Sequence, residues 1–149
     1  MAATKNIFIA HAHADDELVS KLKDLIERSG MAVRNGSIDG HKPNGANNDE
    51  YIKQKYLRPH IDWASTVVVL ITHETAQSDW VDWEIEYAAQ RDKTIVGVFA
   101  QGATDAAIPA ALQKCPDAPL VGWQGERVVD AIEGKIAGQG EPPSDKRDG

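Results

Sequence analysis

Basic residues, cysteine and long apolar runs are all scarce in this chain of 149 residues. Its 16 lysines and arginines face 23 aspartates and glutamates, and the resulting net charge of -7 gives no electrostatic footprint for nucleic acid. The single cysteine, Cys115, cannot form an internal disulfide, which fits a reducing compartment. No stretch approaches the roughly 18 apolar residues of a membrane span, and the first residues lack the apolar core of a signal peptide. We therefore expect a cytoplasmic protein that binds neither nucleic acid nor membranes.

The length of the chain predicts about one domain with a substantial core. Apolar residues make up 42% of the composition, which is ordinary for a globular protein. The last residues, GQGEPPSDKRDG, offer no apolar side chain to bury. We expect one folded domain over residues 1–137 and a disordered tail over 138–149.

Short apolar runs alternate along the chain with amphipathic segments. The run from Thr66 to Thr72 is continuously apolar between its threonines, as in a central parallel strand covered on both faces. Five strands are predicted, over residues 5–10, 31–38, 66–72, 94–100 and 119–122. Helices are predicted over residues 16–29, 49–57, 78–91, 106–113 and 126–136, the second ending or kinking near Arg58 because Pro59 follows.

This alternation predicts an α/β fold in which an open parallel sheet carries helices on both faces, a three-layer sandwich. For five strands the commonest order is the flavodoxin-like 2-1-3-4-5. Ligands of such sheets bind outside the carboxyl ends of the strands, where the strand order reverses between the first and third strands.

Three segments with polar side chains are expected at that edge. Ala10 and His11 end the first strand, and Thr72 and His73 end the third. The polar loop DGHKPNGANN follows the second strand, and its candidates for contacting a ligand are Asp39, His41 and Lys42.

A metal site is the first alternative for this edge, because the sequence His11-Ala12-His13 followed by Asp15 resembles the opening of a zinc site. Asp15 and Asp16, however, have a sufficient role as the cap of the first helix. We therefore predict no metal. Whether His11 lines a ligand crevice or is only structural stays open at this point.

The segment SDWVDWEIEYA, residues 78–88, opens the predicted helix after the third strand. Trp80 and Glu84 are four residues apart and share a helix face, and Trp83 lies next to it. This spacing predicts a carboxylate beside indole surface that opens toward the crevice. Taken alone, each tryptophan is also typical of packing, and a lone helical glutamate is typical of a solvated surface.

The chain resembles the TIR domains, and specifically the bacterial TIR-like branch that includes the sensor subunit of the Thoeris antiphage system. The resemblance rests on NIFIAHAHADDE, DGHKPNGANN, LRPHIDWASTVVVLIT, SDWVDWEIEYA and KTIVGVF, in that order. The loop DGHKPNGANN stands in the position of the family's BB loop. The segment SDWVDWEIEYA aligns with the family pattern Ser-x-Trp-Cys-x-x-Glu-Leu, which places Glu84 on the catalytic glutamate.

The resemblance implies an enzyme that consumes NAD by cleaving its nicotinamide–ribose bond and makes a cyclic or conjugated ADP-ribose signal for antiphage defence. NAD is then a substrate and no cofactor is expected. The implied partners are a further copy of the chain or a phage trigger protein, and an effector that senses the product. The substrate-contacting residues implied around Glu84 are Ala10, His11, Asp39, His41, Lys42, Thr72, His73, Trp80 and Trp83. Two alternatives remain: a non-catalytic TIR-like interaction module, and a nucleoside deoxyribosyltransferase-like enzyme.

Overall fold

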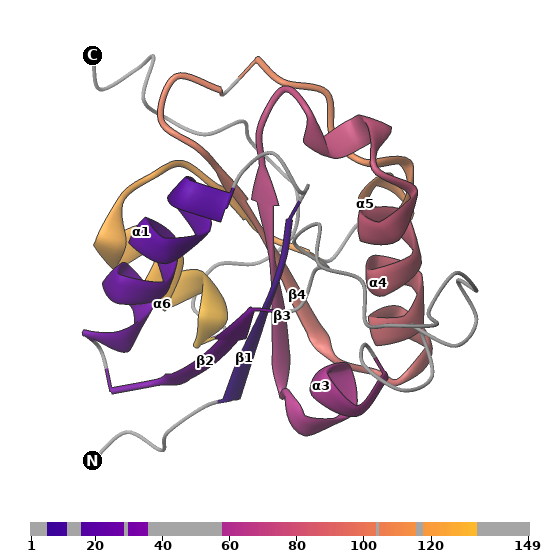
Figure 1. Cartoon of the computed structure of the whole chain (residues 1–149), viewed down its shortest axis with the longest axis horizontal. Coiled ribbons are helices and arrows are strands. Elements are labelled where there is room, and N and C mark those ends of the chain that lie inside the picture. Colours follow the sequence, from indigo (N-terminus) through magenta and orange to yellow (C-terminus); the bar gives the residue numbers. More distant parts are fainter. Residues whose placement is uncertain are drawn as a thin grey trace, which may run out of the picture.

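A computed structural model gives the structure of the chain, and it describes residues 6–11, 16–28, 30–35, 58–103, 105–115 and 118–133. The expected α/β architecture, a parallel sheet with helices around it, is confirmed (Figure 1). The strands are β1 (Asn6–Ala10), β2 (Ala32–Asn35), β3 (Thr66–Ile71), β4 (Thr94–Phe99) and β5 (Leu120–Val121). They form one sheet in the order β2-β1-β3-β4-β5, and every neighbouring pair is parallel.

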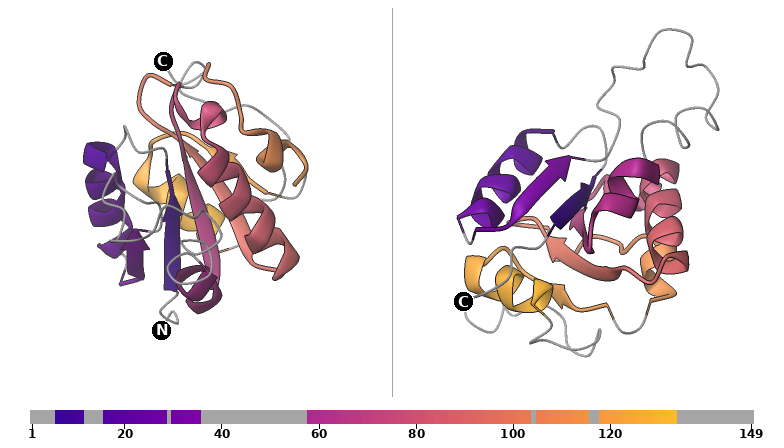
Figure 2. Two further views of the ribbon diagram at one scale, coloured as in Figure 1. Left: turned by 45° about the vertical axis from the view of Figure 1, so that its right-hand side comes forward. Right: turned by 90° about the horizontal axis from the view of Figure 1, so that it is seen from below.

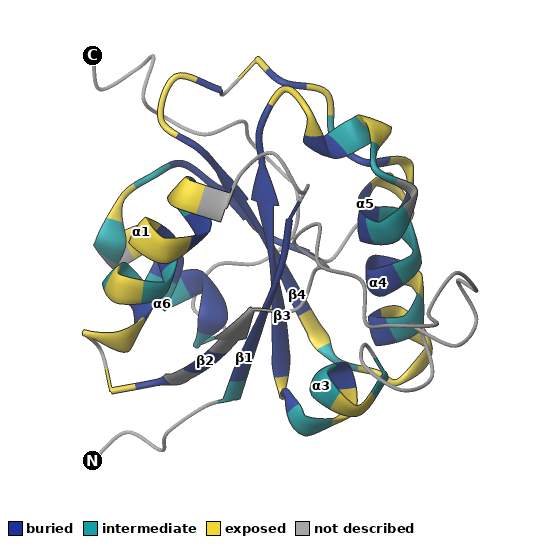
Figure 3. Ribbon diagram, in the orientation of Figure 1, coloured by how far each residue is buried: buried dark blue, intermediate teal, exposed yellow. Residues whose placement is uncertain are grey.

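The helices form two layers on the two faces of the sheet (Figure 2). Helices α1 (Asp16–Glu27) and α6 (Gly125–Ile132) pack against each other on one face. Helices α3 (Arg58–Trp63), α4 (Asp79–Gln90) and α5 (Ala110–Gln113) lie on the other, where α4 packs against β1, β3 and β4. Each helix therefore has one buried and one exposed side (Figure 3).

The core lies between these layers and is almost entirely apolar. All six residues of β3 are buried, and so are the last five of β4. This continuous burial explains why both strands are apolar runs without alternation: side chains on both faces are covered by helices.

Two helices near prolines differ from the predicted pattern. Helix α3 begins at Arg58 and continues past Pro59 to Trp63, a stretch that the sequence does not predict to be helical. The expected helix over 49–57 lies outside the described residues, so its end or kink near Arg58 stays a prediction. Proline is tolerated in a first helical turn, where it has no amide hydrogen bond to lose. Helix α5 begins only at Ala110 rather than at residue 106, because Pro109 has an extended backbone and disfavours a helical Ile108.

The remaining boundaries are close to the predicted ones. Gly30 ends the first helix as expected, since its φ of 87° is a conformation that suits glycine. Helix α6 ends at Ile132 with Glu133 as its cap, before the predicted residue 136. The expected end of the second strand at residues 36–38 and the expected tail at 138–149 lie outside the described residues.

Asp92 ends α4 in a left-handed conformation, with a φ of 60°. The amide of Lys93 donates to Ala88 O at 3.0 Å and that of Asp92 to Ala89 O at 3.1 Å. This pair of bonds is a Schellman motif, in which the left-handed position is usually glycine. Aspartate adds a β-carbon there and a negative charge at the unfavourable end of the helix dipole.

We expect Asp92→Gly to raise the free energy of unfolding by about 1 kcal/mol, because it relieves both effects. Urea denaturation measures the change. Asp92→Asn removes only the charge and serves as the control. An Asp92→Gly protein no more stable than Asp92→Asn would show that the left-handed backbone stores no strain.

Candidate functional site

The connection from β3 to α4 is built by two buried threonines. Thr75 Oγ1 donates to Leu70 O at 2.9 Å and accepts from the Thr72 amide at 2.8 Å. The two threonine hydroxyls lie 3.2 Å apart, and Thr72 Oγ1 also accepts from the Glu74 amide at 3.1 Å. The carboxyl end of β3 therefore passes into a tight turn, the 3-10 helix Thr75–Gln77, whose polar groups are satisfied locally.

Helix α4 starts immediately after this turn. Ser78 is its N-cap, with an extended backbone and a side-chain oxygen that accepts from the Val81 amide at 3.3 Å. The sequence-based start near residue 78 is therefore correct. Serine is a favoured N-cap because its hydroxyl satisfies an amide that has no partner within the helix.

Glu84 lies on the sheet-facing stripe of α4. Val81, Ile85 and Ala88, which occupy positions −3, +1 and +4 from it, are all 0% exposed, and Glu84 itself is 0% exposed. The expectation that its carboxylate opens toward a crevice is not met in this structure: the side chain is enclosed. A carboxylate in this position of an otherwise apolar stripe loses its hydration and opposes folding unless other groups compensate.

The two tryptophans of α4 are half-buried rather than enclosed. Trp83 stacks on Tyr87, with ring centroids 5.3 Å apart and ring planes 9° apart. The pKa of the Tyr87 phenol is raised, mainly by burial and next by the hydrogen bond that the phenol donates to Asp62 at 2.9 Å. Trp83 thus packs within α4 on a tyrosine that is hydrogen-bonded to α3.

At the end of β1, Ala10 is 0% exposed and His11 is 2% exposed. Ala10 pairs in register with Val69 of β3, and α4 packs against both strands. The burial of His11 fits both alternatives left by the sequence, a crevice lining and a structural histidine.

Thr72 and His73 follow β3 but are placed very differently. Thr72 is buried, and its hydroxyl belongs to the turn described above. The ring of His73 is exposed, and its Nε2 lies 3.0 Å from Asp105 Oδ1 in the loop after β4. The structure therefore separates His73, which bridges two loops at the surface, from the buried His11 and Thr72.

Asp39, His41 and Lys42 lie outside the described residues, as do His13 and Asp15 of the alternative zinc site. Within the described ranges, no three histidine, cysteine, aspartate or glutamate side chains come together in a way that could hold a metal ion. In the same ranges, no helix combines the length and apolar character needed to cross a bilayer.

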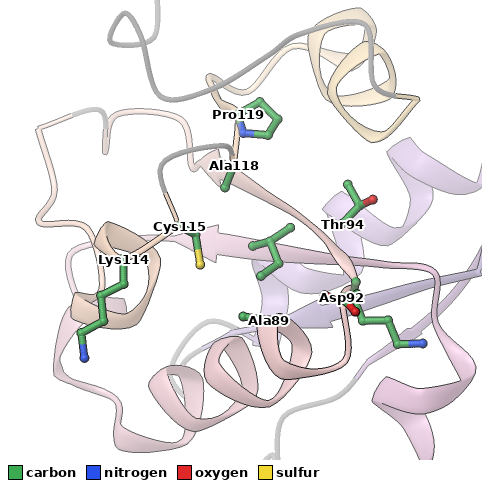
Figure 4. Close-up of a pocket in the computed structure, with 9 residues that line it drawn as sticks. Ala89, Asp92, Thr94, Lys114, Cys115, Ala118 and Pro119 are labelled. Atoms are coloured by element: carbon green, nitrogen blue, oxygen red, sulfur yellow. The ribbon is translucent and has the colours of Figure 1, made fainter.

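A cavity of about 480 Å³ lies at the opposite edge of the sheet, where β4 and β5 begin (Figure 4). Its wall is formed by the ends of α4 and α5 and the starts of the two strands, and its lining residues are Ala89, Asp92, Lys93, Thr94, Ile95, Lys114, Cys115, Ala118 and Pro119. None of the predicted site residues lines it. This cavity is therefore distinct from the predicted site, in which the Glu84 carboxylate is enclosed.

Cys115 in this cavity is expected to be a poor nucleophile. Burial raises the pKa of its thiol, and Sγ lies 3.6 Å from Ala111 O as a donor. A raised pKa leaves less thiolate at a given pH, so the native protein should react with iodoacetamide in mildly alkaline buffer several-fold more slowly than the urea-unfolded chain. Equal rates in the two states would contradict this expectation.

Sequence reasoning missed Thr75 and the burial of Glu84. The burial had a readable signal, because Val81, Ile85 and Ala88 follow helical spacing and Glu84 falls between them on the same stripe. Thr75 had none, since two of its partners, Leu70 O and the Thr72 amide, are main-chain groups whose availability depends on where β3 ends.

Comparisons with known proteins agree with the fold and the motifs. Among solved structures, a conserved protein from Enterococcus faecalis V583 superposes with a TM-score of 0.61 at 12% identity, covering 90% of this chain and 100% of the other; this similarity concerns the fold. No match was found among curated proteins. The family model described as the TIR-like domain of the Thoeris protein ThsB matches residues 8–105, which include the last three residues of β1 and all of β3, α4 and β4. The chain therefore belongs to the family of ThsB TIR-like domains.

Proposed function

We propose that this chain is a TIR-like enzyme of antiphage defence that cleaves the nicotinamide–ribose bond of NAD, with Glu84 as the catalytic carboxylate. Membership in the ThsB TIR-like family suggests the defence role. The released ADP-ribose unit is proposed to form a cyclic or conjugated signal, sensed by a downstream effector. A second copy of the chain or a phage trigger protein is the proposed activating partner.

The observation that carries the proposal is the enclosed carboxylate on an apolar helix stripe. Glu84 is fully buried among Val81, Ile85 and Ala88, where an apolar residue would favour folding. Residues that break a local rule of folding are concentrated at functional sites, where the loss of stability is tolerated for activity. The acidic side chain at this position of the stripe therefore supports a functional role for Glu84.

The chemistry suits a single carboxylate. Breaking the bond between nicotinamide and ribose builds positive charge on the sugar, as in the oxocarbenium-like transition state of glycoside hydrolysis. Nicotinamide leaves as a neutral base, so no general acid has to protonate it. The carboxylate of Glu84 would stabilise the sugar cation, and more strongly where water is excluded.

Substrate contacts are proposed for residues around this carboxylate. Trp80 supplies an indole surface for the nicotinamide or adenine ring, and Ala10, His11 and Thr72 line the approach from the carboxyl ends of β1 and β3. The remaining proposed contacts are Asp39, His41, Lys42, His73 and Trp83. Because Glu84 is enclosed in this structure, NAD can reach it only after its carboxylate is uncovered, which fits a protein that is activated by a partner.

Incubating the purified protein with NAD and separating the products by chromatography tests the proposal. We expect release of nicotinamide, increasing with protein concentration if self-association activates the site. A parallel incubation with a deoxynucleoside and a second free base tests the deoxyribosyltransferase alternative, which predicts base exchange and intact NAD. Intact substrates in both incubations, over the full range of protein concentration and with phage lysate added, would favour the interaction module.

A further inference from the structure

We propose that Thr75 is a positioning residue: its side chain fixes the start of α4 against the end of β3 and thereby sets the place of the Glu84 carboxylate. The inference rests on the function proposed for Glu84. It adds a residue that the sequence motifs do not single out and that is not among the proposed substrate contacts, although it is bonded to one of them, Thr72.

The first step is the anchoring of Thr75 to the sheet. Its side chain is fully buried and makes two short contacts with the main chain at the end of β3, donating to Leu70 O at 2.9 Å and accepting from the Thr72 amide at 2.8 Å; its hydroxyl also lies 3.2 Å from that of Thr72. One hydroxyl thus forms hydrogen bonds with both a main-chain carbonyl, that of Leu70, and a main-chain amide, that of Thr72, at the end of the strand. A buried group with two short main-chain bonds has a single orientation, so the turn is held at a fixed position on β3.

The second step is the connection of this turn to helix α4 by hydrogen bonds. Thr75 O accepts from the Ser78 amide at 3.1 Å, and Ser78 in turn accepts from two amides at the start of α4: its Oγ accepts from Val81 at 3.3 Å and its main-chain oxygen from Asp82 at 3.2 Å. A continuous series of hydrogen bonds therefore joins the end of β3 to the first turn of α4. Glu84 follows less than one turn after Val81, within the same rigid helix.

The third step concerns the accuracy that catalysis requires. A group that stabilises a developing charge must be held to within about 0.5 Å, and a misplacement of about 1 Å can lower a rate by about 100-fold. Glu84 sits on the stripe of α4 that faces β1 and β3, so sliding or rotation of the helix start would move its carboxylate relative to the strand ends. The alternative is that Thr75 only stabilises the fold, without an effect on the site.

Four variants separate these two roles. Thr75→Val removes the hydroxyl while keeping the shape, and Thr75→Ser retains it. Ser78→Ala removes the side-chain bond to the Val81 amide at a partly exposed residue, while the main-chain bonds of Ser78 remain; it decides the question if Thr75→Val does not fold. Ile26→Val, on the buried side of α1, is the control for a general loss of stability.

Two readouts are measured for each variant: NAD turnover under activating conditions, and hydrogen exchange of the main-chain amides of residues 80–84 compared with those of β4. We expect kcat to fall by about tenfold or more in Thr75→Val and Ser78→Ala with little change in KM, since an interaction made mainly in the transition state is lost. Amide exchange at 80–84 should become faster in these two variants alone. Thr75→Ser should restore both readouts.

The proposal is overturned if the folded Thr75→Val or Ser78→Ala protein matches Ile26→Val in kcat and keeps slow exchange at 80–84. If the unaltered protein does not consume NAD, the proposed function fails. Hydrogen exchange alone then decides whether Thr75 anchors the start of α4. Faster exchange at 80–84 with unchanged β4 would still support the anchoring of α4 by Thr75, and unchanged exchange would overturn it.

Discussion

Glu84→Gln is expected to lower NAD turnover by roughly 10² to 10³, or about 3 to 4 kcal/mol of transition-state stabilisation. The amide keeps the shape of the carboxylate and much of its hydrogen bonding but carries no charge to set against the ribose cation. The measurement is nicotinamide release under activating conditions, with a melting curve for the same sample.

The melting temperature of Glu84→Gln should differ little from that of the unaltered protein. The side chain is fully buried, so an uncharged isostere has less hydration to lose on folding, while the loss of charge weakens the interactions that the carboxylate makes there. Loss of activity without loss of folding is the combination expected of a site residue.

Two acidic neighbours on α4 provide the controls. Asp82 accepts a hydrogen bond from the Ala111 amide at 3.2 Å, which an asparagine oxygen can also accept, and Glu86 is exposed. Asp82→Asn and Glu86→Gln should keep most activity. Full turnover by a folded Glu84→Gln protein would remove Glu84 from the mechanism, and the interaction module would become the better account.

Gly97→Ala is expected to destabilise the fold by about 1 to 3 kcal/mol, the usual effect of forcing extra volume into a packed core. A β-carbon at Gly97, in the middle of β4, would lie 2.5 Å from Leu120 Cδ2, 3.1 Å from Ile71 Cδ1 and 3.2 Å from Leu112 Cδ2. These three side chains come from β5, β3 and α5, so space for the methyl group requires movement in several elements at once.

Urea denaturation measures this loss, and Gly125→Ala is the matched control. At Gly125, the first residue of α6, the nearest atoms to an added β-carbon belong to Leu25 at 3.8 Å, an ordinary contact distance. Gly125→Ala should therefore not destabilise the protein, since alanine also favours the helix. Equal stability of the two variants would show that the core around Gly97 can relax.

The sequence by itself determined the central strands, helix α4 and the family. Strands β1, β3 and β4 are predicted within one residue at each end, because a central parallel strand is a local apolar run covered on both faces. Helix α4 is predicted equally well, because Ser78 is a local capping signal. The ordered motifs that led to the TIR-like family are also properties of the chain alone, and the match over residues 8–105 agrees with them.

Only the tertiary structure decided how the groups around Glu84 are placed. Whether a glutamate on an amphipathic helix is enclosed depends on what packs against it, and residues distant in sequence supply that packing. The same holds for the space filled at Gly97 by Leu120, Ile71 and Leu112. Thr75 finds its partners only because β3 ends at Ile71 and leaves main-chain groups there to be satisfied. Periodicity in a sequence reports which face of an element is apolar, whereas burial and hydrogen bonding of a polar residue on that face are set by long-range contacts.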